Sequence, residues 1–167
     1  MGGLDTPWLG GNKKLEVTIY IGIYHKGRLK QGTGTYAAVL EYISSGGKPA
    51  TLTLIKGIKG TTENRTALYA CIEAFKRLTK ECNIKVMINS MYITQAINSN
   101  TYIEWIRTGL NAKKKPVSNL ELWKQLDQVM EKHIFEFEFT EHTPYTCWML
   151  YEVENREIEY MEDKENV

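Results

Sequence analysis

Three stretches rich in β-branched and aromatic residues follow one another in the amino-terminal third of the chain, and this run constrains the fold most. They span residues 17–27, 32–42 and 50–56, and the third alternates apolar and polar residues as a half-buried strand does. The turn signal I-S-S-G-G-K-P at 43–49 separates the second stretch from the third. Two consecutive hairpins, and therefore three antiparallel strands, are predicted.

The pattern changes at Thr61, where apolar residues take up helical spacing as far as residue 78. Thr61 or Thr62 can cap the start of this helix, and basic residues near its end suit the helix dipole. The short apolar run at 84–88 predicts a buried strand. A strand, a helix and a second strand in this order predict a parallel pairing with a right-handed crossover.

The second half supplies the remaining elements. We expect one or two short helices over 91–107, a helix over 119–131, a strand over 134–139 and a helix over 145–160. Ser118 and Glu121 have the spacing of a capping box and predict the start of the second of these helices. The predicted fold class is α/β, a five-stranded mixed sheet in the order β-β-β-α-β-α-α-β-α with helices on both faces.

Length and composition indicate one domain without a membrane span. Of the 167 residues, 43 % are hydrophobic and 25 % are charged, and no apolar run reaches the length of a transmembrane helix. We expect a flexible leader over 1–14, the domain over 15–160 and an acidic tail over 161–167. Three cysteines without a C-x-x-C motif argue against disulfides and a zinc site and favour a reduced, cytoplasmic setting.

Five short motifs, in this order, resemble motifs of the ribonuclease H family. They are G-T-G-T-Y-A-A-V-L-E-Y at 32–42, G-T-T-E-N-R-T-A-L-Y-A at 60–70, I-N-S-M-Y-I at 88–93, K-K-K-P-V-S-N-L-E-L-W at 113–123 and F-E-F-E-F-T-E-H at 135–142. Each motif is weak alone, but together they run from about residue 16 to residue 150. The resemblance implies the family's fold and its chemistry, two-metal hydrolysis of a phosphodiester in which carboxylates hold magnesium.

The positions at which the resemblance places the four metal-binding carboxylates hold no acid in this sequence. They hold Gly22, Ala67, Asn89 and, in the last helix, Trp148. Because magnesium is held mainly by carboxylates, we expect no metal, no cofactor and no catalytic residue at these positions. The chain is therefore expected not to be an enzyme.

Apolar residues are expected to fill the former metal cleft, where a protein partner or a second copy of the chain could bind. They are Tyr20, Tyr24, Met91, Trp148 and Met149. The suggestion of self-association rests on analogy with inactive copies of this fold that serve as dimerisation modules.

A local basic patch is the expected route to nucleic acid, since the net charge of +1 gives no general attraction to polyanions. The predicted contacts are Lys113, Lys114, Lys115, Asn64 and Arg65. Two alternatives remain open. The lysines could belong to a solvated loop that binds nothing, and Arg65 could pair with nearby acids instead of binding nucleic acid. Where the family contacts the minor groove of a hybrid, this chain has Glu63 and Met91, which weakens that expectation.

We do not expect the three histidines or two glutamates of the last predicted strand to bind a metal. His25 and His133 lack partners at ligand spacing and are expected at the surface, and His142 is expected to be a loop residue. Glu136 and Glu138 share one face of a strand, which period-two alternation explains better than a relocated metal pair.

The leading hypothesis from the sequence is thus a non-catalytic ribonuclease H-like module that binds nucleic acid or a protein. The alternative is a metal-dependent ribonuclease acting on RNA–DNA hybrids with displaced acids. Its candidate acids are Glu63, Glu138, Glu141 and Glu152.

Overall fold

The computed structural model describes residues 14–27, 32–44 and 46–163, so the predicted leader, apart from Lys14, lies outside the described residues. The strands are β1 (Leu15–Lys26), β2 (Gly32–Ile43), β3 (Pro49–Thr61), β4 (Cys82–Ile88), β5 (Ile134–Phe139) and β6 (Tyr160–Glu162). The helices are α1 (Glu63–Lys76), α2 (Met91–Asn98), α3 (Thr101–Thr108), α4 (Leu120–Met130) and α5 (Thr146–Asn155).

The strands form one mixed sheet in the order β5-β4-β1-β2-β3-β6. β1, β2 and β3 pair antiparallel as two hairpins, whereas β4 pairs parallel to β1 and β5 pairs parallel to β4. This confirms the three antiparallel strands and the parallel crossover predicted from the sequence. β1 is central, so its side chains meet neighbours on both sides.

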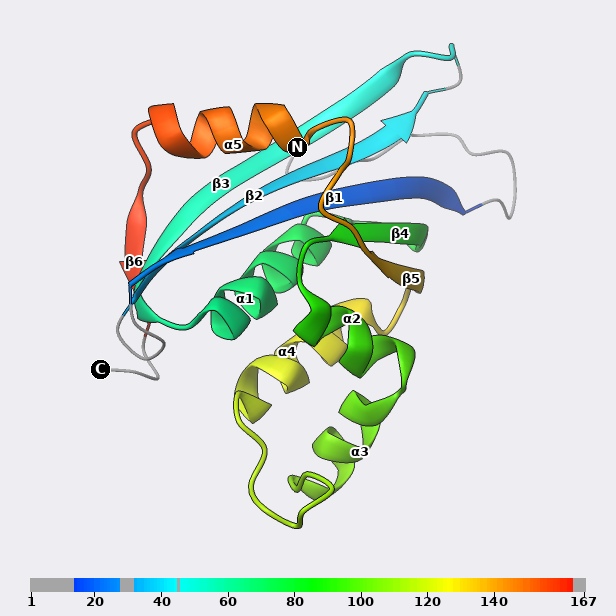
Figure 1. Cartoon of the computed structure of the whole chain (residues 1–167). Coiled ribbons are helices and arrows are strands. Elements are labelled where there is room, and N and C mark those ends of the chain that lie inside the picture. Colours follow the sequence, from blue (N-terminus) through cyan, green and yellow to red (C-terminus); the bar gives the residue numbers. More distant parts are fainter. Residues whose placement is uncertain (1–13, 28–31, 45, 164–167) are drawn as a thin grey trace.

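Helices cover both faces of the sheet, as predicted (Figure 1). α1 runs along one face with α2, α3 and α4 beside it, and α5 lies on the opposite face over β2 and β1. The main core lies between α1 and the sheet and is built from the odd-numbered residues of β1, from Leu15 to Ile23. The even-numbered residues of β1, including Gly22, therefore face the side of α5.

The described residues form six strands and five helices, which corrects the prediction of five strands. The segment 91–107 forms two helices, and the last helix ends at Asn155 instead of continuing to 160. Residues 160–162 instead form β6, which pairs parallel to β3 at the edge of the sheet. A strand of three residues is too short to give an alternation signal, so the sequence pattern could not reveal it.

The carboxyl-terminal segment is anchored by a buried ion pair. Asp163, 1 % exposed, accepts hydrogen bonds from Arg65 Nε at 2.7 Å, Arg65 Nη2 at 3.0 Å, the Thr61 hydroxyl at 2.6 Å and the Tyr69 hydroxyl at 3.1 Å. Residues 161–163 thus belong to the folded domain, and the expected tail does not begin at 161. Residues 164–167 lie outside the described residues.

The predicted capping box at the start of α4 is wrong. The N-cap is Asn119, in the left-handed conformation with φ of 65° and no side-chain cap bond. Glu121 reaches Arg65 instead, with Oε2 at 3.1 Å from Nη2. A buried guanidinium is a stronger partner for a carboxylate than an amide at a helix end. At the start of α1, Thr62 caps the helix as predicted, with its hydroxyl accepting from Arg65 N.

His133 is buried, which corrects its expected surface position. It is 6 % exposed, and its Nδ1 accepts a hydrogen bond from Cys82 N at 3.1 Å. Burial, and then the positive charge of Lys132, lower the pKa of the imidazole.

Cys71 and Cys82 are buried and Cys147 is exposed, and the structure places none of them in a disulfide. Among the described residues, no helix is both long and apolar enough to cross a membrane.

Removing the Asp163 carboxylate should destabilise the domain. Asp163→Asn leaves a buried guanidinium short of a charge partner, and the free energy of unfolding should fall by about 3 kcal/mol, since breaking a buried pair costs on the order of 3–5 kcal/mol and Glu121 remains. Urea denaturation measures this. Glu162→Gln, an exposed neighbour in β6, is the control and should change stability by less than about 0.5 kcal/mol. Equal effects of the two variants would contradict the anchoring role.

His133 should make stability depend on pH. Its pKa is lower in the folded state, so the unfolded state binds more protons as the pH falls below about 6.5. The stabilisation is complete above that pH and is lost as the pH falls through the folded-state pKa. Denaturation curves between about pH 8 and pH 5 should give a smaller slope for His133→Gln than for the unmodified chain. The exposed His142→Gln should keep the original slope, and a loss of slope there instead would contradict the assignment.

Candidate active site

The carboxyl ends of β1 and β4 are joined by the side chain of Asn89, one of the four positions derived from the family resemblance. The parallel pairing of these strands reaches Ile21 and Ile88. One residue further, Asn89 Oδ1 accepts from Ile23 N at 2.8 Å and Nδ2 donates to Ile23 O at 3.2 Å. The carboxamide thus continues the ladder as a further backbone-like pair. A carboxylate could accept the first bond but could not donate the second.

Tyr24 lies over Gly22, the position of the first expected acid. A Cβ atom at Gly22 would stand 2.5 Å from the Tyr24 hydroxyl oxygen and 3.0 Å from Cζ. Residues 22 and 24 share a face of β1, so the ring folds back along the strand over the glycine. Burial, and then the charge of Glu154 in α5, raise the pKa of this phenol, so it stays neutral at physiological pH. The space that a carboxylate at 22 would need is therefore filled.

Ala67 lies in the main core. It is on the buried face of α1, together with Leu68 and Cys71. Its methyl group packs where the second expected acid would stand.

α5 places Met149, not Trp148, against the sheet. Trp148 is 36 % exposed, whereas Met149 is 2 % exposed and packs on Ala37 and Val39 of β2. The prediction that Trp148 fills the cleft is therefore corrected, because the buried stripe of α5 is shifted by one residue. Tyr20 lies beside this cluster as predicted, but Met91 is largely exposed.

These four positions do not suit magnesium. The ion takes oxygen ligands and is held in proteins by carboxylates. Here the only side-chain oxygen among the four is Asn89 Oδ1, which is neutral and already accepts from Ile23 N. Within the described ranges, no group of three or more histidine, cysteine, aspartate and glutamate side chains is placed to hold a metal.

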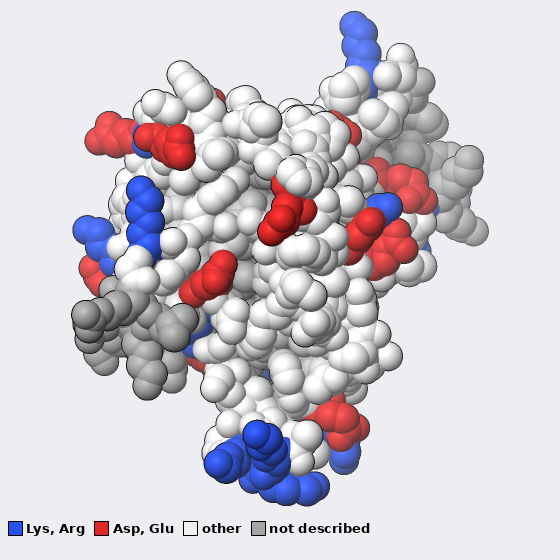
Figure 2. All heavy atoms as spheres, viewed as in Figure 1, with Lys and Arg blue, Asp and Glu red and all other residues white. Residues whose placement is uncertain are grey.

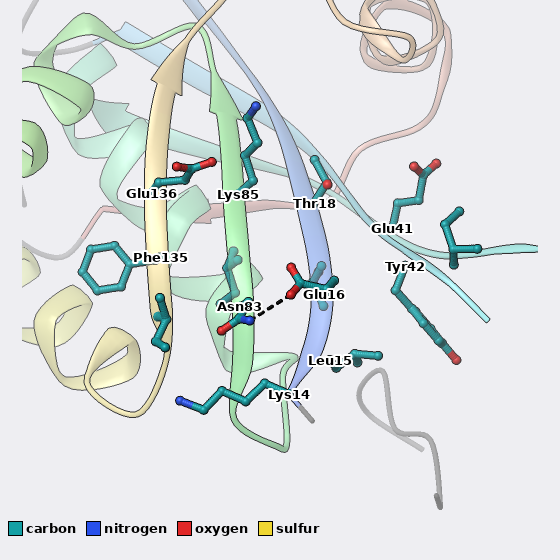
Figure 3. Close-up of a pocket in the computed structure, with 14 residues that line it drawn as sticks. Lys14, Leu15, Glu16, Thr18, Glu41, Tyr42, Asn83, Lys85, Phe135 and Glu136 are labelled. Carbon is teal, nitrogen blue, oxygen red and sulfur yellow. Dashed lines mark hydrogen bonds between the residues drawn. The ribbon is translucent and has the colours of Figure 1, made fainter. Parts of the chain in front are cut away.

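A separate pocket of about 740 Å³ lies toward the other end of β1 and β4 (Figure 3). In it Asn83 donates to Glu16 at 2.8 Å, and Lys85 and Glu136 extend side by side from neighbouring strands. Glu138, the other member of the predicted strand-face pair, makes an ion pair with Lys85 at 3.3 Å. Glu136 and Glu138 thus lie on the sheet face with a lysine, in keeping with a solvated face.

The three predicted lysines lie at the tip of the loop between α3 and α4, where basic side chains gather at the bottom of the view in Figure 2. Asn111 holds this loop, because its Oδ1 accepts from Lys113 N at 2.9 Å and from Lys115 N at 3.1 Å. Lys114 takes the left-handed conformation with φ of 61°. An isolated bridge between Leu110 and Pro116 closes the base of the loop. The lysines are exposed on a backbone that is already ordered.

Asn64 and Arg65, the other predicted contacts, differ in their placement. Asn64 is exposed in the first turn of α1, where a phosphate could reach it. Arg65 is 3 % exposed and is paired with Asp163 and Glu121. We assign Arg65 a structural role, which is the open alternative that the sequence offered.

The fold and this site define an α/β domain of the ribonuclease H type, and comparisons with known proteins give the family. The RNase H family model matches residues 18–143, and the chain belongs to the ribonuclease H family. A relative from Lachnoclostridium phytofermentans named Ribonuclease H is 33 % identical over 136 residues, which cover 81 % of this chain and 80 % of that one. Ribonuclease H of Pectobacterium atrosepticum is 38 % identical over 108 residues, 65 % of this chain and 67 % of that one.

Solved structures share the fold. LC9-RNase H1, described as a type 1 RNase H with the type 2 active-site motif, matches with a TM-score of 0.72 and 21 % identity over 85 % of this chain and 72 % of that one. LC11-RNase H1 in complex with RNA/DNA hybrid matches with a TM-score of 0.55 and 16 % identity over 80 % of this chain and 92 % of that one.

The family comparison corrects one prediction. The sequence led us to expect that the chain is not an enzyme, yet relatives 33 % and 38 % identical to it are named Ribonuclease H. The four substitutions concern only the place in the fold where the family pattern puts its metal ligands. They do not decide whether the chain has activity through other residues.

Asn89→Asp should destabilise the domain although it restores an acid of the family pattern. The carboxylate loses the donated bond to Ile23 O and leaves a part-buried acceptor unpaired, which costs about 1–2 kcal/mol. Urea denaturation at neutral pH measures the loss. Asn64→Asp, at an exposed position, is the control and should stay within about 0.5 kcal/mol. A stable Asn89→Asp chain would show that the amide pairing does not hold the strands.

Proposed function

We propose that this chain acts on RNA–DNA hybrids and holds them through the loop 111–117. Family membership supports this, as does the likeness in fold to LC11-RNase H1, whose structure contains an RNA/DNA hybrid. The observation that carries the proposal is the ordered loop with three exposed lysines. Lysines presented in this way attract a phosphate backbone without reading its sequence.

The electrostatic background makes the loop the natural contact. The net charge of the chain is +1, and Glu104 and Arg107 on the neighbouring α3 pair with each other at 2.7 Å. Arg107 offsets the negative charge of Glu104, although Glu104 also interacts electrostatically with Lys114 of the loop. Each lysine that meets a phosphate releases counterions, so binding should weaken steeply with salt.

We propose hydrolysis of the hybrid as the activity, since the relatives' name favours a ribonuclease over a passive module. The acids would then be displaced from the four positions described above. Glu141 is the leading candidate, because Thr140 N donates to Ile88 O at 2.9 Å, which brings the segment that follows β5 to the end of β4. Glu63 is exposed at the start of α1, whereas Glu138 and Glu152 make ion pairs with Lys85 and Arg156.

Protein binding and self-association stay predictions from the sequence. The exposed side chains of α5, among them Trp148 and Tyr151, are where a partner would make contact.

The basic loop can be tested by a salt titration. Lys113→Ala/Lys114→Ala/Lys115→Ala should lower affinity for an RNA–DNA hybrid and reduce the slope of log K against log salt by about 2–3, the value for three phosphate contacts. Fluorescence anisotropy measures both. The control removes three exposed lysines elsewhere, at Lys48, Lys76 and Lys132, and should leave the slope within about 1 of the original. An unchanged slope in the loop variant would remove the loop from the interface.

Hydrolysis can be tested with a labelled RNA–DNA hybrid in magnesium or manganese. Cleavage is expected, and Glu141→Gln should reduce its rate by at least about tenfold, the scale of losing a partner at a metal site. Glu131→Gln, at an exposed position after α4, is the matched control and should cleave normally. Absence of cleavage with either metal would refute the proposed activity, and full cleavage by Glu141→Gln would move the site to other acids.

A further inference from the structure

We propose that the ends of β1 and β4, where the family pattern places metal ligands, form a packed seam that excludes divalent cations, and that Tyr24 is the side chain that closes it. This goes beyond the proposed function, because it concerns where a metal does not bind. A ribonuclease with displaced acids would carry its metal outside this seam.

The Tyr24 ring occupies the space beside Gly22. A Cβ at Gly22 would meet the Tyr24 hydroxyl at 2.5 Å, below the closest approach of real Cβ atoms, and the Tyr24 ring carbon Cε2 at 3.1 Å. An acid at 22 therefore requires the far end of the Tyr24 side chain to move aside. The glycine and the tyrosine are therefore one packing unit.

The hydrogen bonds of Asn89 are already used within the fold. Asn89 uses both ends of its carboxamide on the backbone of Ile23. To offer its oxygen to an ion, the side chain would have to rotate and leave both a donor and an acceptor of β1 unpaired, and each buried polar group left unpaired carries a free-energy cost.

The side chains at the family's ligand positions carry no negative charge. Gly22, Ala67 and Asn89 are neutral, and Ala67 is an apolar side chain in the core. Met149 of α5 packs on β2, the strand beside β1. Magnesium is held in proteins mainly by carboxylates, which these positions do not supply.

Paramagnetic broadening tests the proposal without any activity assay, in a Glu141→Gln chain from which the candidate metal ligand near the end of β4 has been removed. Manganese broadens the amide resonances of residues close to it. With Mn²⁺ added to an NMR sample, the resonances of Ile21–Ile23 and Ser90 should broaden no more than those of other exposed or half-buried positions. Selective broadening centred on Gly22 and Asn89 would overturn the proposal.

A rebuilt site supplies the positive control. In the same Glu141→Gln chain, Gly22→Asp/Tyr24→Ala/Asn89→Asp presents two carboxylates with the ring removed, and the same resonances should now broaden selectively with Mn²⁺. Circular dichroism establishes that this variant is folded. A folded variant without broadening would mean that Tyr24 and the missing acids are not what excludes the ion.

A double-mutant cycle tests the role of Tyr24 by stability alone. Gly22→Asp should lower the melting temperature by roughly 3–10 °C through overpacking. In a Tyr24→Ala background the same change should cost far less, because the ring is gone. In a Tyr20→Ala background the full loss should persist, since Tyr20 packs against Tyr145 with ring centroids 5.0 Å apart. Equal losses in the two backgrounds would contradict the assignment to Tyr24. These outcomes are independent of hybrid cleavage, so failure here is distinguishable from failure of the proposed activity.

Discussion

The carboxamide of Asn89 holds the centre of this sheet together where the backbone pairing of β1 and β4 ends. Its two hydrogen bonds to Ile23 keep the ends of the strands aligned. β1 is also the strand on which Gly22 lies beneath the ring of Tyr24, and β2 beside it receives Met149 from α5.

A second polar centre fixes the other side of the molecule. Arg65 joins the start of α1 to Glu121 of α4 and to Asp163 after β6. A buried guanidinium needs carboxylates around it, and here they come from segments far apart in the chain. Arg65 therefore has a structural role, and the exposed lysines of the loop 111–117 are the contacts that we propose for a phosphate backbone.

Much of the fold could be read from periodicity. The hairpins of β1, β2 and β3, the crossover through α1 and the alternation of β5 are patterns within single elements. β6 could not be found in this way, because three residues carry no period and the pairing partner lies about a hundred residues earlier. The capping box of Ser118 and Glu121 failed for a similar reason, since the partner of Glu121 is distant in sequence.

The sequence predicted which positions form the site, but it did not predict how their side chains pack. The motifs located Gly22 and Asn89 in β1 and β4, and the structure brings them to neighbouring strand ends. Spacing alone did not show that Tyr24, two residues along the same strand face, closes over Gly22, although residue parity was a usable signal. The step from missing acids to missing activity went too far, as the relatives named Ribonuclease H indicate.

A crystal structure of the chain with an RNA–DNA hybrid and Mn²⁺, with anomalous scattering used to locate the ions, would show directly whether a metal binds at the ends of β1 and β4. We expect Asn89 paired with Ile23, the Tyr24 ring over Gly22 and no manganese between the two strand ends. An anomalous peak at that position, with Tyr24 moved aside, would contradict it.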